Sequence, residues 1–202
     1  MHGNVVFNFL GNPIDDLVAF AQGYHTAGKI LVEKMENSTG YRDYEGYPIL
    51  YLYRHALELF IKAIVYKGAK LLKLISNKSL NTEKLFKEHK LSIFLPAIKI
   101  IFNEINWKWN FEISGLKSFK DFSDFIREID SMDPHSYIFR YPIKKTREAS
   151  LNRHSVINVI NFSRRLDPIL DLLNGAVTGL GYEWDLAAET AYEFNKIIKN
   201  LL

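Results

Sequence analysis

The stretch Tyr47 to Lys67, "YPILYLYRHALELFIKAIVYK", carries its charged residues on one narrow line of a helix. At about 100° of rotation per helical residue, a set of five polar side chains projects within a sector roughly 100° wide: Tyr51, Arg54, His55, Glu58 and Lys62. The rest of the circumference is apolar or aromatic, whereas a surface helix usually shows one apolar stripe on a polar cylinder. We therefore expect a central helix that carries a compact charged cluster into or beside the core, where charge is costly unless it is paired or functional.

The composition is that of a soluble globular protein. The 202 residues are 48% hydrophobic, so the chain can bury a sizeable core, and we expect one domain over 1–202. There is no cysteine, which excludes disulfides and thiolate metal sites and fits the cytoplasm. The net charge of +3 neither demands nor forbids nucleic acid. The apolar run 5–10 lacks the basic flank of an export signal, and no stretch is long and apolar enough to span a membrane.

Apolar spacings of three and four residues dominate the chain, which predicts an all-α fold with five or six helices in one bundle. We expect helices over 13–36, 48–74, 83–106 with an interruption at Pro96, 116–129, 151–174 with a bend near Pro168, and 185–202. The segment "GAVTGLGYEW" should separate the last two helices. Residues 135–150 have a β-like composition in their first half and two prolines, so we expect a structured loop or a short extended segment there.

The first candidate site is the line of Arg54, His55, Glu58 and Lys62 on the central helix. Arg54 and Glu58 are four residues apart, as are Glu58 and Lys62, so a continuous ladder of ion pairs is geometrically easy. Two interpretations are open. The line is either a solvated strip on an otherwise buried helix, or a partly desolvated cluster whose perturbed protonation serves binding or catalysis.

The second candidate is a polar face in "RHSVINVINFSRRLDP". His154, Asn158, Asn161 and Arg165 follow one another at four, three and four residues, so they fall within about 60° on one helix face. The plainer interpretation is a polar face that caps the helix and contacts its neighbours.

Basic residues precede that face. Arg147 stands before His154 with six residues between them, and Lys144 and Lys145 lie beside it. The pair suits phosphodiester cleavage, because His moves a proton near neutral pH and Arg holds phosphate and offsets charge in the transition state. RNA supplies its own 2′-hydroxyl nucleophile, so this chemistry needs no metal.

A third candidate joins two separate segments. His89 opens an apolar helical run in "KEHKLSIFLPAI", and Arg140 lies between aromatic residues in "DPHSYIFRYP". An Arg flanked in this way is more often an anchor than a solvent-exposed residue. Its anionic partner could be Glu58 or Asp133.

Several common signatures of catalytic sites are missing from the sequence. It holds no glycine-rich phosphate loop, no HExxH motif, no paired carboxylates of the di-iron type and no nucleophile elbow. No two of the six histidines have metal-ligand spacing on one face. We expect neither a metal site nor a cofactor.

Four segments in this order resemble HEPN-like helical proteins of bacteria. They are "LYRHALELFIKA" at 52–63, "EHKLSIFL" at 88–95, "DPHSYIFRYP" at 133–142, and the Asn-bearing helix that follows. The resemblance covers about 47–174 and implies an antiparallel helical bundle, with the N- and C-terminal helices packed on this core. It also implies a homodimer, because proteins of this group commonly form one.

The resemblance further implies an activity. Many HEPN proteins are metal-independent endoribonucleases of toxin–antitoxin, abortive-infection or CRISPR-linked defence, with an active site made of an Arg, four to six intervening residues and a His. Arg147 and His154 match that spacing at its upper limit, although Glu148 stands where the group usually has Asn, Asp or His.

The leading expectation is therefore a metal-independent endoribonuclease of HEPN type in a toxin–antitoxin or phage-defence system. His154 would act as general base or acid and Arg147 would contact the phosphate. Lys144 and Lys145 would steer the RNA backbone, and Asn158 would orient His154 or the substrate. Arg165 is a further candidate for binding.

The alternative is a non-catalytic HEPN-like module, since members that lack the motif act as binding or scaffold proteins. It would bind a nucleotide, a nucleic acid or a partner protein in a polar pocket lined by Arg54, His55, Glu58 and Arg140, with His89 in the same network. The expected partners under the two interpretations are a second copy of the chain, RNA or a nucleotide, and a cognate antitoxin protein, without a membrane.

Overall fold

The computed structural model describes residues 16–38, 40, 43–109, 113, 115–144, 146–150 and 156–201. These residues form an all-α fold in which no strand is present. Its elements are α1 (Leu17–Glu36), α2 (Asp43–Ser76), a 3-10 helix η1 (Leu91–Phe94), α3 (Leu95–Glu104), α4 (Phe119–Met132) and α5 (Val159–Leu201). The all-α class predicted from the apolar spacing is confirmed. Within the described ranges, no helix combines the length and apolarity needed to cross a membrane.

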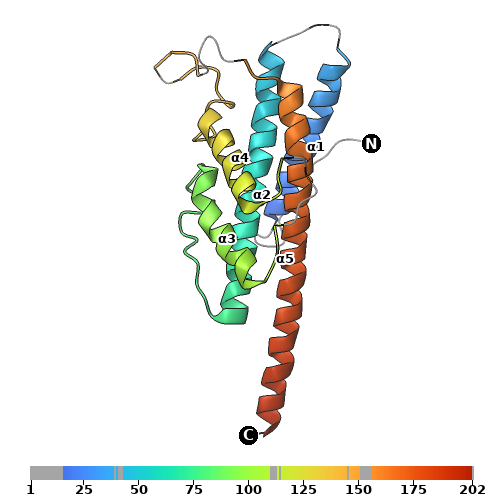
Figure 1. Cartoon of the computed structure of the whole chain (residues 1–202), viewed down its shortest axis with the longest axis vertical. Coiled ribbons are helices and arrows are strands. Elements are labelled where there is room, and N and C mark those ends of the chain that lie inside the picture. Colours follow the sequence, from blue (N-terminus) through green and yellow to red (C-terminus); the bar gives the residue numbers. More distant parts are fainter. Residues whose placement is uncertain are drawn as a thin grey trace, which may run out of the picture.

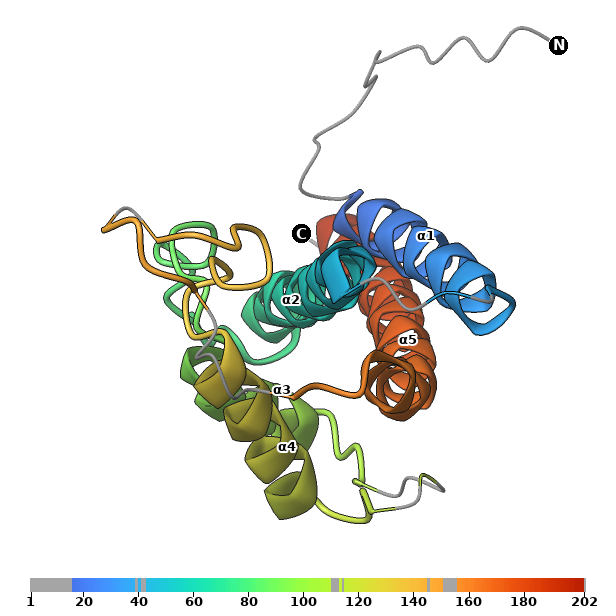
Figure 2. The same cartoon turned by 90° about the horizontal axis from the view of Figure 1, so that it is seen from above.

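Helix α2 is the centre of the molecule. It packs against α1 and α5 along most of its length, while η1 and α3 contact it from another side and α4 packs on η1 (Figures 1 and 2). Its apolar residues are buried around most of the helix, among them Ile49, Leu57, Phe60, Ile64 and Leu71. The central, all-round apolar helix that the opening stretch predicts is therefore present.

The helices do not all alternate in direction. Helix α1 runs antiparallel to α2, as expected, but α5 runs parallel to α2 (Figure 1). The elements between α2 and α5 return the chain to the end of the molecule at which α2 begins, so α5 starts there and descends beside α2.

The third helix is shorter than the expected 83–106. Residues 83–87 form turns, and the helical path begins only with η1 and α3. Asp130 of α4 fixes this start, because its two carboxylate oxygens accept hydrogen bonds from the Leu91 and Ser92 N–H groups at 2.9 and 2.7 Å. Pro96 lies in the first turn of α3, where its missing N–H costs nothing.

Helix α5 differs most from expectation, since residues 159–201 form one continuous helix rather than two. The glycines of 175–184 do not end it. Gly179 instead lets α5 approach a tryptophan, because an added Cβ would lie 2.7 Å from the Trp107 ring. Tertiary packing here outweighs the helix-breaking tendency of glycine. The helix begins eight residues later than expected, where the Asn158 side chain accepts a hydrogen bond from Asn161 N at 2.9 Å.

The remaining boundaries shift by a few residues. Helix α2 begins at Asp43 rather than at Pro48, and α4 begins after Ser118, whose hydroxyl accepts a hydrogen bond from Asp121 N. The described residues of 135–150 form turns with one isolated β-bridge between Ile143 and Ala149, which matches the irregular segment expected there.

Candidate functional site

Three charged residues on successive turns of α2 form what we call the charge ladder: Arg54, Glu58 and Lys62. Their exposed fractions are 0%, 2% and 4%. Glu58 accepts hydrogen bonds from Arg54 Nη1 at 3.1 Å and from Lys62 Nζ at 2.7 Å, so both ion pairs expected from the spacing form. The burial excludes the solvated strip that was the plainer interpretation of this line.

His89 holds the chain that precedes η1 onto the ladder. Its Nδ1 lies 2.9 Å from Glu58 Oε1, and its carbonyl oxygen accepts a hydrogen bond from Arg54 Nη2. The His89 side chain is itself 45% exposed, so it covers the ladder on the solvent side. The prediction that His89 shares a network with Arg54 and Glu58 is confirmed.

Glu58 is ionised because its partners outweigh its burial. Burial alone would raise the pKa of Glu58. The hydrogen bond and charge of Lys62, the charge of Arg54 and the hydrogen bond from His89 together hold that pKa below its usual value. With two cations and one carboxylate, the ladder carries a net charge of +1, and Arg54 Nε is buried without a hydrogen-bond partner among the described residues.

A second group of side chains consists of Tyr51 and His55 of α2, Tyr24 of α1 and Arg140, and we call it the Tyr51 stack. The Tyr51 and His55 rings stack at 5.4 Å with 13° between their planes, and Tyr24 of α1 meets His55 edge-on at 4.5 Å. On Tyr51 lies the guanidinium of Arg140, 5.1 Å from the ring centroid. Arg140 is exposed and the three rings are half-buried, so the stack runs from the surface into the molecule.

His55 is a neutral imidazole at pH 7. Burial lowers the pKa of His55, Glu58 opposes that change, and the charges of Arg140, Lys62 and Arg54 lower the pKa further. Its Nδ1 is buried and has no hydrogen-bond partner among the described residues. The ring therefore serves as an uncharged stacking surface rather than as a cation.

Arg140 does not form the ion pair expected of it, and no described residue gives it one. Glu58 already has three donors. One oxygen of Asp133 accepts hydrogen bonds from Tyr137 N and Ile138 N at 2.8 and 2.9 Å, which closes the turn that carries Arg140. Arg140 is an exposed cation over an aromatic ring, and the anchoring role inferred from its neighbours is wrong.

Arg147 lies in a tight, exposed turn. Lys144 N donates to Glu148 O at 2.8 Å and Arg147 N donates to Lys144 O at 2.9 Å, while Arg147 has a left-handed φ of 67°. Lys144 and Arg147 are both exposed on this turn. Lys145 and His154 lie outside the described residues, so the pairing of Arg147 with His154 stays a prediction.

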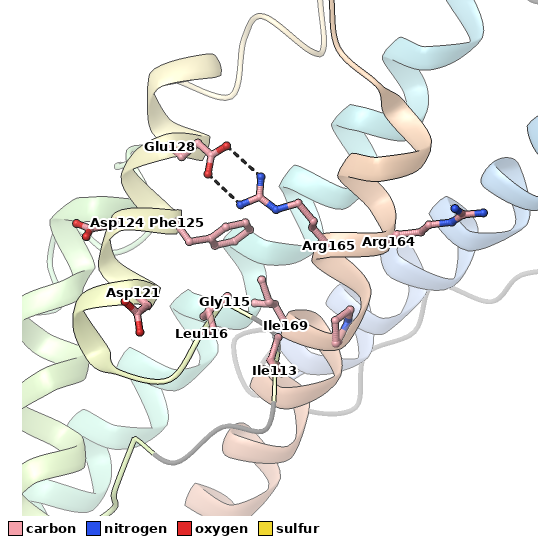
Figure 3. Close-up of a pocket in the computed structure, with 11 residues that line it drawn as sticks. Ile113, Gly115, Leu116, Asp121, Asp124, Phe125, Glu128, Arg164, Arg165 and Ile169 are labelled. Atoms are coloured by element: carbon pink, nitrogen blue, oxygen red, sulfur yellow. Dashed lines mark hydrogen bonds and ion pairs between the residues drawn. The ribbon is translucent and has the colours of Figure 1, made fainter.

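The two other residues proposed for RNA binding on the second candidate face have structural partners. Asn158 caps α5, as described above. Arg165 is held by Glu128 of α4 through two hydrogen bonds of 3.1 Å, and its guanidinium lies over Phe125 (Figure 3). These contacts match the plainer interpretation of this face, in which it caps the helix and contacts its neighbours. The roles proposed for Asn158 and Arg165 in RNA binding stay predictions.

A cavity of about 720 Å³ separates α4 from α5 beside that contact (Figure 3). Its charged lining comprises Asp121, Asp124, Glu128, Arg164 and Arg165. Arg165 is paired with Glu128, and Arg164 reaches Glu36 of α1 at 2.8 Å. Asp124 is paired with Lys120 and Arg127 outside the lining, so Asp121 is the one charged lining residue without an ionic partner among the described residues. Both lining arginines are already paired, so the cavity does not suit a phosphate. The spacing of 121, 124 and 128 could have indicated this acidic face of α4.

Sequence reasoning also missed a triad of polar side chains that joins three helices. Asp167 of α5 accepts a hydrogen bond from Tyr53 Oη of α2 at 2.9 Å and lies 2.8 Å from His25 Nε2 of α1. Burial and the neighbouring Asp167 raise the pKa of Tyr53. No local signal joins residues more than one hundred positions apart. The triad fastens three helices, with Tyr53 and His25 buried and the Asp167 side chain 32% exposed.

No three His, Asp or Glu side chains in the described ranges are grouped so that they could hold a metal ion. Comparison of the chain with protein-family models, with curated proteins and with solved structures finds no match. The geometry of the charge ladder and the Tyr51 stack therefore carries the functional argument.

Proposed function

We propose that this protein is an RNA-binding module that takes single-stranded RNA at the Tyr51 stack. The observation that carries the proposal is the exposed Arg140 guanidinium lying 5.1 Å from the Tyr51 ring centroid, with His55 stacked on the same ring. Proteins read single-stranded RNA by stacking unpaired bases on aromatic rings or on guanidinium planes. Arg140 offers an exposed guanidinium group beside the Tyr51 ring for such a contact.

The charge around the stack fits the same ligand. Arg54, Lys62 and Arg140 stand against the single carboxylate of Glu58 in the ladder and stack, so this region is positive by two charges. Burial keeps Arg54 and Lys62 from direct contact with a ligand, but in a poorly solvated region their charge still favours an anion nearby. Arg140 is the cation that can reach both a base and the adjoining phosphate.

The test is fluorescence anisotropy of a labelled single-stranded RNA titrated with the full chain. We expect binding that weakens as salt is raised, because phosphate contacts release counterions. Arg140→Gln should raise Kd at least about fivefold, given that stacking contributes about 1–3 kcal/mol per base. Arg127→Gln is the matched control, since Arg127 is an exposed Arg of α4 paired only at the surface.

Two results would reject the proposal. One is an absence of binding by the folded wild-type chain. The other is an equal Kd for Arg140→Gln and Arg127→Gln. That result would mean that Arg140 contributes no more to RNA binding than another exposed Arg does.

A second candidate function is the metal-independent endoribonuclease of HEPN type, in a toxin–antitoxin or defence setting. The left-handed turn that exposes Arg147 seven residues before His154 favours it. Arg147 would contact the phosphate and His154 would move the proton. The test is cleavage of labelled total RNA in EDTA by wild type and His154→Ala. Cleavage that the substitution abolishes supports the nuclease, whereas no cleavage by either folded protein rejects it.

A further inference from the structure

A second open cavity, of about 700 Å³, lies between α5 and the chain that follows α3. Its lining comes from α3, from the residues just after α3, from α4 and from one face of α5. Figure 1 shows the chain after α3 passing beside α5. The described lining shares no residue with the charge ladder or the Tyr51 stack, so this cavity is a separate feature of the molecule.

Two glycines one helical turn apart leave the α5 side of the cavity open. Leu172, Gly175, Ala176 and Gly179 are spaced so that they lie on one face of α5, and all four line the cavity. At Gly179 the Trp107 ring packs closely on the helix, so the tryptophan closes that end. At Gly175 an added Cβ would meet no atom within 4 Å. A side chain at position 175 would therefore project into space that the protein leaves unfilled.

A connected cluster of aromatic rings forms the other side of the cavity. Phe102 and Phe122 are buried and both stack on Trp109, with ring centroids at 4.7 and 5.4 Å and 23° and 28° between the planes. Phe102 also meets Trp107 edge-on at 5.3 Å. The two tryptophans are half-buried, so they present ring surface to the cavity while the phenylalanines hold them in place. The aromatic wall is thus formed before any ligand enters.

One cation at the cavity has no counter-ion. Three lining residues are polar: Asn106, Lys108 and Asp171. Asp171 pairs with Lys29 of α1 at 3.8 Å and lies 3.8 Å from His25 Nδ1. Lys108 is exposed and has no ionic partner among the described residues. The cavity therefore combines an aromatic, apolar interior with one unpaired positive charge.

We propose that this cavity binds a small aromatic carboxylate, with its rings between the tryptophans and α5 and its carboxylate at Lys108. The volume lies within the range of about 300–1,000 Å³ that is usual for small-molecule sites. An apolar cavity left empty forfeits the packing contacts of its lining, which an apolar ligand restores. An aromatic ligand suits these walls better than an aliphatic one, because it can also stack on the tryptophan rings or meet them edge-on. The unpaired Lys108 selects an anion. This binding does not depend on the RNA site.

Isothermal titration calorimetry of the full chain tests the class of ligand. The probes are naphthoate and naphthamide, which have the same rings and differ in charge. We expect naphthoate to bind with a Kd below about 1 mM and more tightly than naphthamide. Lys108→Gln should weaken naphthoate about threefold to fivefold and leave naphthamide unchanged. Lys117→Gln is the matched control, because Lys117 is an exposed lysine of the same connection outside the lining, and it should bind both probes as wild type does.

Filling the cavity tests its position. Gly175→Leu should abolish the binding of both probes without lowering the melting temperature, because leucine favours the helix and its Cβ meets no atom. Gly23→Leu is the matched control. Gly23 is an exposed glycine of α1 at which an added Cβ also meets no atom within 4 Å, so this variant should keep both Kd values of wild type.

Four results overturn the proposal in whole or in part. An absence of naphthoate binding by the folded wild type, or binding that survives Gly175→Leu, overturns the site itself. Equal Kd values for naphthoate and naphthamide overturn the choice of an anion. Decanoate that binds more tightly than naphthoate overturns the choice of an aromatic ligand.

Discussion

Helix α2 carries two groups of polar side chains that differ in what surrounds them. In the charge ladder, Glu58 has three polar partners and is 2% exposed, so the group has no position left for a ligand. In the Tyr51 stack, Arg140 is exposed and has an aromatic ring in place of a carboxylate. Neighbouring positions of one helix therefore differ: the ladder is a closed set of buried ion pairs, whereas the stack ends in an exposed cation that comes from another segment.

Removing the central charge of the ladder should have the largest effect. Glu58→Gln leaves Arg54 and Lys62 buried without their shared counter-ion, and breaking a buried pair in this way costs about 3–5 kcal/mol of unfolding free energy. Urea denaturation followed by circular dichroism measures it. Asp124→Asn is the control, since Asp124 is half-exposed and pairs with Lys120 and Arg127 at the surface. An equal loss in both variants would contradict the structural role of the ladder.

Truncating His89 should have a smaller effect. His89→Ala removes one hydrogen bond to Glu58 but leaves the backbone carbonyl that accepts from Arg54. We expect a loss of about 1 kcal/mol in the same denaturation experiment. A loss as large as that of Glu58→Gln would show that the imidazole, rather than the two cations, balances the carboxylate.

The pH dependence of stability should separate the ladder from the stack. The pKa of His55 is lowered by folding, so the unfolded chain binds the proton more readily, and stability falls as pH decreases below about 6.5. Folding also lowers the pKa of Glu58, so protonation of Glu58 reduces stability only as pH falls below about 4.5. Melting temperatures between pH 7.5 and 5.5 should therefore fall less steeply for His55→Asn than for wild type. Parallel slopes would mean that His55 is not desolvated.

The amino-acid sequence was sufficient to predict the ladder because all three residues lie on one helix. The four-residue spacing of Arg54, Glu58 and Lys62 brings them together whenever that helix forms. The apolar residues around the rest of α2 placed the line in or beside the core, but spacing alone left open whether it was solvated, and the burial is known from the structure. The all-α class followed in the same way from spacing alone.

Contacts between distant elements could not be predicted from spacing. Tyr24 joins the stack from α1 and Asp167 joins His25 from α5, and both contacts depend on how helices pack rather than on any local pattern. The division expected at 175–184 was wrong for a related reason. Glycine has a low helix propensity, which is why a break was expected there. At Gly179, however, the missing side chain allows Trp107 to pack closely against the helix.

The central claim is that Arg140 serves binding while the ladder serves stability, and measuring both quantities on one variant tests it most directly. For Arg140→Gln, we predict that Kd for single-stranded RNA rises at least about fivefold while the unfolding free energy stays within about 0.5 kcal/mol of wild type. An unchanged Kd, or a loss of stability of several kcal/mol alongside weaker binding, would contradict the account.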